Sequence, residues 1–174
     1  MPRAPVKKDG PAKSSLTKKD PQKPFWRRKA LQQMNVEEWE SLCDGCGKCC
    51  TYTLEDEETS DLYRTNVACK LFDSGTCGCG DYANRFKTVP ECLKVTPQNI
   101  ETLEFFPPTC AYLLVFEGKD LPDWHHLVCG DREEIHRRGL SVQGRTISES
   151  VIGEADLEDF VIEWPEDGDA AIEE

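Results

Sequence analysis

Residues 43–50 read Cys43-Asp44-Gly45-Cys46-Gly47-Lys48-Cys49-Cys50, which is the pattern C-x2-C-x2-C-C. Four more thiols follow at Cys69, Cys77, Cys79 and Cys92, so eight of the ten cysteines lie between residues 43 and 92. Thiols at C-x2-C spacing can reach one soft metal ion, and the intervening glycines let the backbone fold tightly around it. The pattern predicts a domain nucleated on metal-bound thiolates.

A disulfide framework in a secreted protein is the alternative use of so many cysteines. The basic N-terminus is not followed by an apolar segment of the secretory kind, and adjacent Cys49 and Cys50 are awkward to pair. We therefore expect a cytoplasmic protein, in which clustered cysteines more often bind metal. We also expect no membrane span, since no run of eighteen apolar residues occurs.

The charge is divided unevenly along the 174 residues. Residues 1–34 carry a net +8 and residues 35–174 a net −20, which together give −12. An acidic body argues against nucleic acid as the main partner, because phosphate contacts need clustered cations. We expect a disordered basic tail over 1–24, a single cysteine-cluster domain over 25–164 and a frayed acidic tail over 165–174.

The periodicity of apolar residues predicts a small, mostly irregular α+β domain with short helices and a small antiparallel sheet. A helix is expected over 25–42, either single or broken near Asn35, and it leads directly to Cys43. The acidic run Glu55–Glu58 is expected to be a solvated loop. The other expected elements are helices at Asn99–Phe106 and Asp131–Arg138, the latter ended by Gly139, and strands at Cys110–Phe116 and Leu140–Ile147.

Two metal chemistries fit the thiols. Eight thiolates could fill two tetrahedral zinc sites, and C-x2-C-x2-C is also the run that holds an iron–sulfur cluster in bacterial ferredoxins. The chain departs from that ferredoxin run, because Cys50 follows Cys49 at once and no proline comes next. Side chains of adjacent cysteines are expected to diverge, so one of the pair could serve a second metal. Zinc and an iron–sulfur cluster both remain open.

Other candidate residues have a functional and a structural interpretation. His125 and His126 could complete a mixed Cys/His site or donate a proton, but a turn histidine packed on Trp124 is favoured. Asp81 could line a site close to Cys79, or it could cap a short helix. Cys110 and Cys129 each adjoin apolar residues and are expected to be ordinary core thiols. No hydrolase, P-loop, dinucleotide-binding or metalloprotease motif occurs, so an enzymatic role is left undecided.

The chain resembles the YcgN family of bacterial cysteine-cluster proteins, within the wider group of CxxCxxCC zinc- or iron-chelating proteins. The resemblance covers roughly residues 25–147. It is carried by Phe25-Trp26, Glu38-Trp39-Glu40-Ser41-Leu42, Cys43 through Cys50, Asn66-Val67-Ala68-Cys69, Thr76-Cys77 with Cys79, Pro90-Glu91-Cys92, Pro108-Thr109-Cys110-Ala111-Tyr112, Glu117-Gly118-Lys119-Asp120-Leu121-Pro122 with Trp124-His125, and Ser141-Val142.

The resemblance implies binding of zinc or iron, with no established reaction. It implies the ligand set Cys43, Cys46, Cys49, Cys50, Cys69, Cys77, Cys79 and Cys92, with Cys110 as a possible addition. Cys129 falls outside the family pattern.

Three functions are compatible with these observations. The first is a metal-binding protein whose centre is at least structural. The second is an iron–sulfur redox protein or enzyme subunit, with a cluster near Asp81, Arg85 and His125. The third is a metal-stapled interaction module that presents its acidic surface to a basic protein partner.

Overall fold

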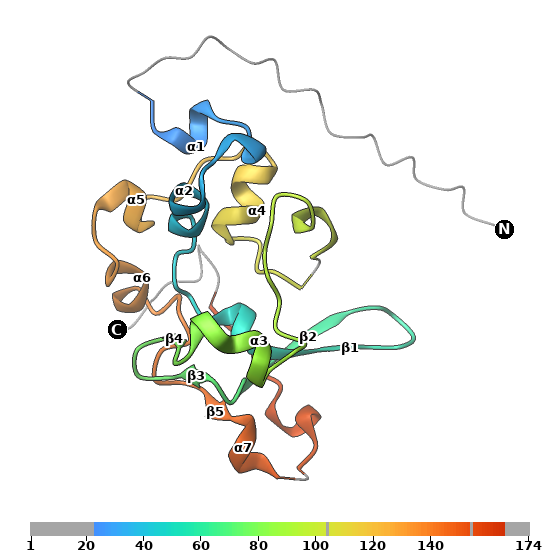
Figure 1. Cartoon of the computed structure of the whole chain (residues 1–174). Helices are drawn as coiled ribbons and strands as arrows, with labels where there is room; N and C mark the ends of the chain where they lie inside the picture. Colours follow the sequence, from blue (N-terminus) through green and yellow to red (C-terminus); the bar gives the residue numbers. More distant parts are fainter. Residues whose placement is uncertain (1–22, 104, 154, 166–174) are drawn as a thin grey trace, which may run out of the picture.

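A computed structural model describes residues 23–103, 105–153 and 155–165 (Figure 1). The predicted basic and acidic tails lie outside these residues, apart from Lys23, Pro24 and Pro165. None of the described helices is long and apolar enough to cross a membrane.

The described residues form short helices and strands, with four of the strands grouped between residues 51 and 79. The α-helices are α1 (Phe25–Arg28), α2 (Val36–Ser41), α3 (Arg85–Thr88), α4 (Ala111–Phe116), α5 (His126–Cys129), α6 (Glu134–Arg137) and α7 (Glu149–Ile152). The 3-10 turns are η1 (Leu31–Gln33), η2 (Lys48–Cys50), η3 (Tyr82–Asn84), η4 (Ile100–Thr102) and η5 (Leu157–Phe160). The strands are β1 (Thr51–Glu55), β2 (Leu62–Ala68), β3 (Phe72–Asp73), β4 (Gly78–Cys79) and β5 (Ile147–Ser148). This confirms the predicted α+β class.

The segment 25–42 is broken near Asn35, which is one of the two expected outcomes. Asn35 forms a capping box with Glu38: its side chain accepts from the Glu38 amide, and Glu38 accepts from the Asn35 amide. The cap starts α2, whose Trp39 is buried and donates its indole N–H to the carbonyl of Val95 at 3.0 Å. The part before Asn35 is divided again, into α1 and η1. The alternative prediction of a single long helix is therefore wrong.

The strand predicted over Cys110–Phe116 is wrong, because these residues form α4. Ala111, Tyr112 and Val115 are the buried positions, which is a helical spacing. The Tyr112 ring packs on Trp39 of α2 with centroids 4.7 Å apart. The helix is therefore stabilised by its packing on α2, a contact that the local pattern does not reveal.

Two other predicted elements are shorter than expected. Of the helix predicted over Asn99–Phe106, the described residues form only η4. Of the strand predicted over Leu140–Ile147, only Ile147 enters a strand, β5. The helix predicted over Asp131–Arg138 is confirmed as α6, and Gly139 follows it with a positive φ of 69°.

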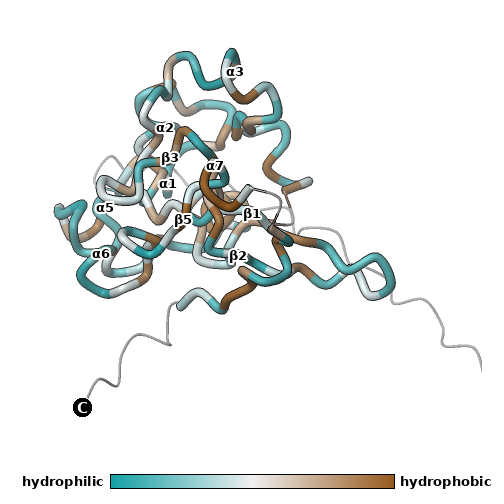
Figure 2. Tube along the Cα trace, turned by 90° about the horizontal axis from the view of Figure 1, so that it is seen from below, coloured by the Kyte–Doolittle hydropathy of each residue, from teal (hydrophilic) through white to brown (hydrophobic). Residues whose placement is uncertain are grey.

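The main sheet has the order β1-β2-β5 and is mixed rather than purely antiparallel. β1 pairs antiparallel with β2, and β2 pairs parallel with β5. The β1–β2 hairpin projects from the body, and its tip is hydrophilic (Figures 1 and 2). The acidic run Glu55–Glu58 begins at the end of β1 and continues into this tip, as the solvated-loop interpretation predicts.

Three clusters of buried apolar side chains surround the C-x2-C-x2-C-C motif. Leu42, just before the motif, belongs to the cluster that includes Trp39 and Tyr112. Cys46 packs against a cluster of Trp124, Ile135 and Leu140. Cys50 packs against a third cluster, formed by Ala68, Phe72, Cys77, Val142 and Trp164. The motif therefore lies where the separate parts of the core meet.

Candidate metal centre

Two glycines shape the backbone of the motif. Gly45 and Gly47 have φ values of 80° and 76°, in the left-handed region that side chains disfavour. Around Gly45 there is open space, but a Cβ on Gly47 would lie 2.7 Å from atoms of Phe72 and Val142. Gly47 is therefore required both for its dihedral angles and for the close approach of the motif to the core.

Polar contacts hold the motif on both sides of Gly47. Asp44 is buried, and its carboxylate accepts from the Cys46 amide at 2.9 Å. The Cys46 carbonyl in turn accepts from the Val142 amide at 2.8 Å. Lys48 is only 1% exposed, and its ammonium group donates to the Pro165 carbonyl at 2.5 Å. The motif is thus anchored to two distant segments of the chain.

A first group of thiols comprises Cys43, Cys46, Cys49 and Cys110. Desolvation raises the pKa of Cys43, and the negative charges that Cys49 and Cys110 would carry raise it further. Desolvation also raises the pKa of Cys110 to about 12, with Cys49 again among the causes. Cys110, just before α4, is therefore coupled electrostatically to Cys43 and Cys49 of the motif.

Members of this group remain accessible although protein surrounds them. The side chains of Cys43 and Cys49 are exposed, and those of Cys46 and Cys110 are half-buried. Asp44 adds a negative charge that raises the pKa of all four thiols. Several thiolates could therefore coexist here only with a cation to balance them.

Backbone amides donate to the sulfurs of this group. Hydrogen bonds from the amides of Gly45 and Lys48 oppose the rise in pKa of Cys43 and Cys46, respectively. In each pair the donor lies two residues after the cysteine. Cys69 repeats the arrangement, since the Leu71 amide lies 3.5 Å from its sulfur. Such donors stabilise the charged thiolate, which is the form that binds metal.

A second group of thiols comprises Cys69, Cys79 and Cys92. Desolvation raises the pKa of Cys92, and the charges of Cys69 and Cys79 contribute in the same direction. The Arg85 guanidinium opposes the rise through its charge and a hydrogen bond. Arg85 is itself buried and stacks over the Tyr82 ring at 3.7 Å, so it is held beside this group.

The thiols of Cys50 and Cys77 each contact a residue of the first group. The Cys50 thiol contacts that of Cys49, and this hydrogen bond is the largest cause of the raised pKa of Cys49. The expected divergence of the adjacent side chains is therefore wrong. Cys77 is buried in the third cluster, and its sulfur donates to the Cys46 carbonyl at 3.5 Å. Desolvation raises the pKa of Cys77 to about 11.

The two groups are neighbourhoods rather than complete coordination shells. Across the described ranges, no three His, Cys, Asp or Glu side chains are arranged so that they could hold a metal ion as they stand. The predicted ligand set thus remains a prediction. The chemistry of the donors nevertheless fits a soft cation, because the thiols are grouped, repel one another when charged and receive amide hydrogen bonds.

His125 is confirmed as a structural histidine of a turn. It is fully buried, its Nδ1 accepts from the Leu127 amide at 3.1 Å, and its Nε2 lies 3.0 Å from the Leu42 carbonyl. Both ring nitrogens are therefore occupied, which removes His125 as a metal ligand or proton donor. His126 stacks on it with centroids 4.5 Å apart, and burial lowers the pKa of His126 to about 4.

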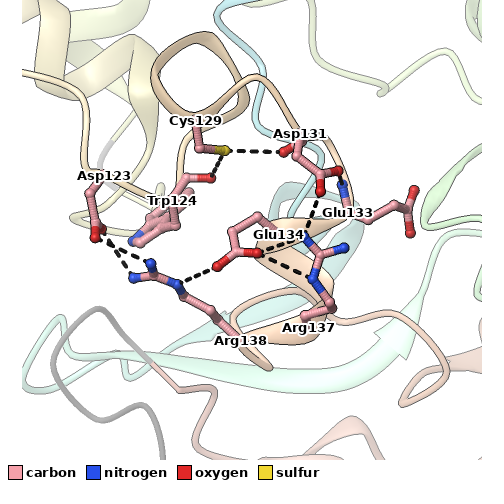
Figure 3. Close-up of polar contacts among 8 residues, drawn as sticks. All are labelled: Asp123, Trp124, Cys129, Asp131, Glu133, Glu134, Arg137 and Arg138. Carbon is pink, nitrogen blue, oxygen red and sulfur yellow. Dashed lines mark hydrogen bonds and ion pairs between the residues drawn. The ribbon is translucent and has the colours of Figure 1, made fainter.

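Cys129 is the last residue of α5, and Figure 3 shows its sulfur beside Trp124 and Asp131. It is exposed, so the expected core position is wrong, but its thiol donates to the carbonyls of Trp124 and Asp131 at 3.3 and 3.4 Å. The same view shows Arg138, at the end of α6, between Asp123 and Glu134, and these ion pairs join α6 to the segment before α5. Cys129 belongs to this structural region.

Asp81 and Arg85 have different surroundings. Asp81 stands at the N-cap position of η3, and its carboxylate accepts from the Asn84 side chain at 3.0 Å. It makes no side-chain bond to the η3 backbone, so it caps the turn by position only. Arg85 donates to the Tyr82 carbonyl at 2.6 Å and is the residue of the two that reaches a cysteine.

Comparison with known proteins places the chain in a family. A protein from Pseudomonas savastanoi pv. phaseolicola, named "UPF0260 protein", is 56% identical over 139 residues, which cover 80% of this chain and 93% of the relative. A Caulobacter sp. (strain K31) protein of the same name is 58% identical over 140 residues, covering 80% of this chain and 86% of the relative. The chain belongs to the UPF0260 family. No solved structure matches this UPF0260 chain.

A family model for CxxCxxCC, described as a "Putative zinc- or iron-chelating domain", matches residues 42–111 of the UPF0260 chain. The match begins one residue before Cys43 and ends one residue after Cys110. It therefore encloses both groups of thiols and excludes Cys129. The description supports a metal ion as the partner of this domain, in agreement with the donors found there.

Proposed function

We propose that this protein binds zinc or iron through Cys43, Cys46, Cys49 and Cys110, and that this centre is at least structural. The observation that carries the proposal is the position of Cys110. It comes from a distant part of the chain, yet its thiol acts electrostatically on Cys43 and is acted on by Cys49. Four thiolates are the complement of a structural zinc site or an iron–sulfur cluster.

A structural role is supported by what such a centre would connect. Cys43 follows α2 after one residue, Leu42, and Cys110 immediately precedes α4. The two helices already pack through Trp39 and Tyr112. A bound metal would supply the positive charge that offsets the grouped thiolates, and its binding free energy would add to the stability of this contact.

An iron–sulfur redox protein is the second candidate, and one observation favours it. The three cysteines of C-x2-C-x2-C are joined by a fourth from elsewhere in the chain, which is how a ferredoxin cluster draws its ligands. In an iron–sulfur protein, Cys110 would be the distant fourth ligand of the cluster. His125 takes no part, because both its ring nitrogens are already bonded.

Elemental analysis and a visible spectrum of one anaerobically purified sample test both versions. Zinc in a colourless protein supports the structural centre, whereas iron with acid-labile sulfide and absorbance near about 400 nm supports the cluster. Cys46→Ser should lower the metal content, while the matched control Cys129→Ser should leave it unchanged. A wild-type protein that holds neither metal after purification with both supplied would overturn the proposal.

A further inference from the structure

The outer edge of β1 is not paired with any other strand of the described residues. We propose that this edge, with the cleft beside it, is the docking site of the chain's own basic N-terminal segment (residues 1–22), and that residues 12–20 pair with β1 as an added strand. The proposal concerns the surface of the β1–β2 hairpin rather than the cysteines, so it goes beyond metal binding and does not depend on it.

The backbone of β1 has groups available for a further strand. β1 is an edge strand, because the sheet has the order β1-β2-β5. The Tyr52 carbonyl accepts from the hydroxyl of Thr65 on β2 at 3.0 Å, so the backbone of Tyr52 faces β2. Backbone groups alternate in direction along a strand, and those of Thr53 and Glu55 therefore point away from β2. An unpaired edge of this kind can accept an extended peptide as an added strand.

A cleft of about 450 Å³ opens beside β1. Residues of β1 form one part of its lining, and Thr102 and Phe105, from the segment around η4, form another. Tyr52, Leu62 and Phe105 give the cleft apolar surface. The Thr53 hydroxyl is buried, and no group of the described residues bonds to it, although Thr53 lines the cleft. A buried hydroxyl without a partner costs free energy, which a docked chain that bonds to it would recover.

The hairpin beside this cleft is acidic. It carries five carboxylates, at Glu55, Asp56, Glu57, Glu58 and Asp61, and the first of them lines the cleft. Residues 51–63 contain no Lys or Arg, and none of the five carboxylates forms an ion pair with a described residue. A cationic segment would offset the repulsion among these carboxylates. The occupant that suits the cleft is therefore an extended chain with basic side chains.

The N-terminal segment has the matching charge. Residues 1–22 carry six Lys or Arg and two Asp, which is a net +4. Proline cannot donate to a strand ladder, so prolines limit which part of the segment can pair with β1. The longest stretch without proline is 12–20, and it contains Lys13, Lys18 and Lys19 with Leu16 between them. Leu16 suits the apolar surface of the cleft, and the lysines suit the carboxylates of the hairpin.

The point of attachment brings this segment within reach of the cleft. Phe25 of α1, two residues after Lys23, packs against the same apolar cluster as Phe105, which lines the cleft. From Leu16 to Lys23 an extended chain spans about 25 Å, which is close to the diameter of a small domain. A tethered segment also has a high effective concentration, so modest contacts are sufficient. Docking of 12–20 would order part of a tail for which the composition predicts disorder.

Amide hydrogen exchange of the full-length protein, measured residue by residue by NMR, tests the added strand. In the triple variant Lys13→Glu, Lys18→Glu, Lys19→Glu the Thr53 amide should exchange about tenfold faster than in the wild type, as expected when a segment docked about 90% of the time is released. The Asp56 amide, which is bonded to the Asp61 carbonyl within the hairpin, should not change. The matched control Arg3→Glu, Lys7→Glu, Lys8→Glu has the same net charge and should exchange like the wild type. Equal Thr53 exchange rates in all three proteins would overturn the docking.

Carbodiimide cross-linking of the wild type identifies the occupant. An equal mixture of isotope-labelled and unlabelled chains is cross-linked, digested and mapped by mass spectrometry. We expect Lys13, Lys18 and Lys19 to be joined to the hairpin carboxylates within one chain. Links between a labelled and an unlabelled chain would assign the cleft to the segment of a second copy and overturn docking within the chain. Links equally frequent at Lys7 and Lys8 would show attraction between charges without a defined site and overturn it as well. Neither measurement involves the cysteines, so a negative result leaves the proposed metal centre standing.

Discussion

The Nε2 atom of His125 lies 3.0 Å from the carbonyl oxygen of Leu42, the residue that precedes Cys43. Because Nδ1 of the same ring accepts from the Leu127 amide, the proton is on Nε2, which donates to Leu42. A buried imidazole thus fixes the backbone from which the cysteine motif begins.

Removing this ring should destabilise the fold. His125→Ala leaves the Leu42 carbonyl without its donor and opens a cavity beside Trp124, so we expect the free energy of unfolding to fall by about 2–4 kcal/mol. Urea denaturation followed by circular dichroism measures the change. The control is Val128→Ala on the same helix, where a half-exposed side chain should change stability by less than about 0.5 kcal/mol. Equal effects of the two substitutions would contradict this role for His125.

The neighbouring histidine should make stability depend on pH. Burial lowers the pKa of His126 from 6.5 to about 4, so between these values the unfolded chain binds more protons than the folded one. The free energy of unfolding should therefore fall as the pH drops from about 6.5 toward 4, and level off below. For a half-buried ring screened by solvent we expect a contribution of about 1 kcal/mol.

His126→Leu isolates this contribution. The variant should lose less stability than the wild type between pH 7 and pH 5, as read from urea midpoints of the two proteins measured in parallel. Any pH dependence of metal binding is shared by both proteins and cancels in the difference. Identical pH profiles would show that His126 does not titrate as the structure indicates.

The two glycines of the motif offer a matched pair. Gly45→Ala should lower the free energy of unfolding by about 1–2 kcal/mol. This is the cost of the left-handed backbone conformation alone, since nothing lies within 4 Å of the new Cβ. Gly47→Ala adds contacts of 2.7 Å with Phe72 and Val142, and should lower stability by about 2–5 kcal/mol. Thermal or urea unfolding of both variants shows which substitution lowers stability more. A Gly45 variant as damaging as the Gly47 variant would be inconsistent with the packing described.

Lys48 should hold the last described residues of the chain. Lys48→Met keeps the buried stem but removes the ammonium group that bonds the Pro165 carbonyl, so we expect a loss of about 1–3 kcal/mol. Limited proteolysis should also cut more readily between residues 155 and 165. Lys70→Met, at an exposed lysine, serves as the control. Equally fast cleavage of both variants would contradict the proposal that Lys48 holds this segment in place.

Removing metal should unfold the cysteine-rich segment if the metal centre is structural. Treatment with a chelator under reducing conditions should increase protease cleavage within residues 43–94 and reduce the circular dichroism signal. Re-addition of zinc should reverse both effects. Unchanged circular dichroism and protease resistance after complete metal removal would exclude a structural role.

The features that the sequence could predict are those with short-range causes. Asn35 followed by Glu38 is a capping box readable from the sequence, and the structure has the helix start there. Two other signals are equally local: Gly139 after a charged helix, and the acidic run Glu55–Glu58 between the cysteine groups. The α+β class was predicted from the periodicity of apolar residues, although four of the five strands lie within residues 51–79, where none was expected.

The wrong predictions concern elements whose structure depends on contacts between residues far apart in the sequence. The apolar run Cys110–Phe116 has no clear period, and only packing of Tyr112 on Trp39 makes it a helix. Cys110 packs against the core cluster, as expected for a core thiol, but its charge effect on Cys43 was not predicted. The division of the thiols into two groups depends on such contacts, so spacing along the chain could not predict it.

The distance along the chain between Cys49 and Cys110 has a consequence for how the protein is made. At translation rates of about 5–20 residues per second, the motif leaves the ribosome about 3–12 s before Cys110 does. During that interval the nascent chain exposes Cys43, Cys46 and Cys49, without Cys110, to the metal ions of the cell. Four-thiolate selectivity between metal ions is possible only once Cys110 has been synthesised. The choice of metal would therefore be made late in synthesis.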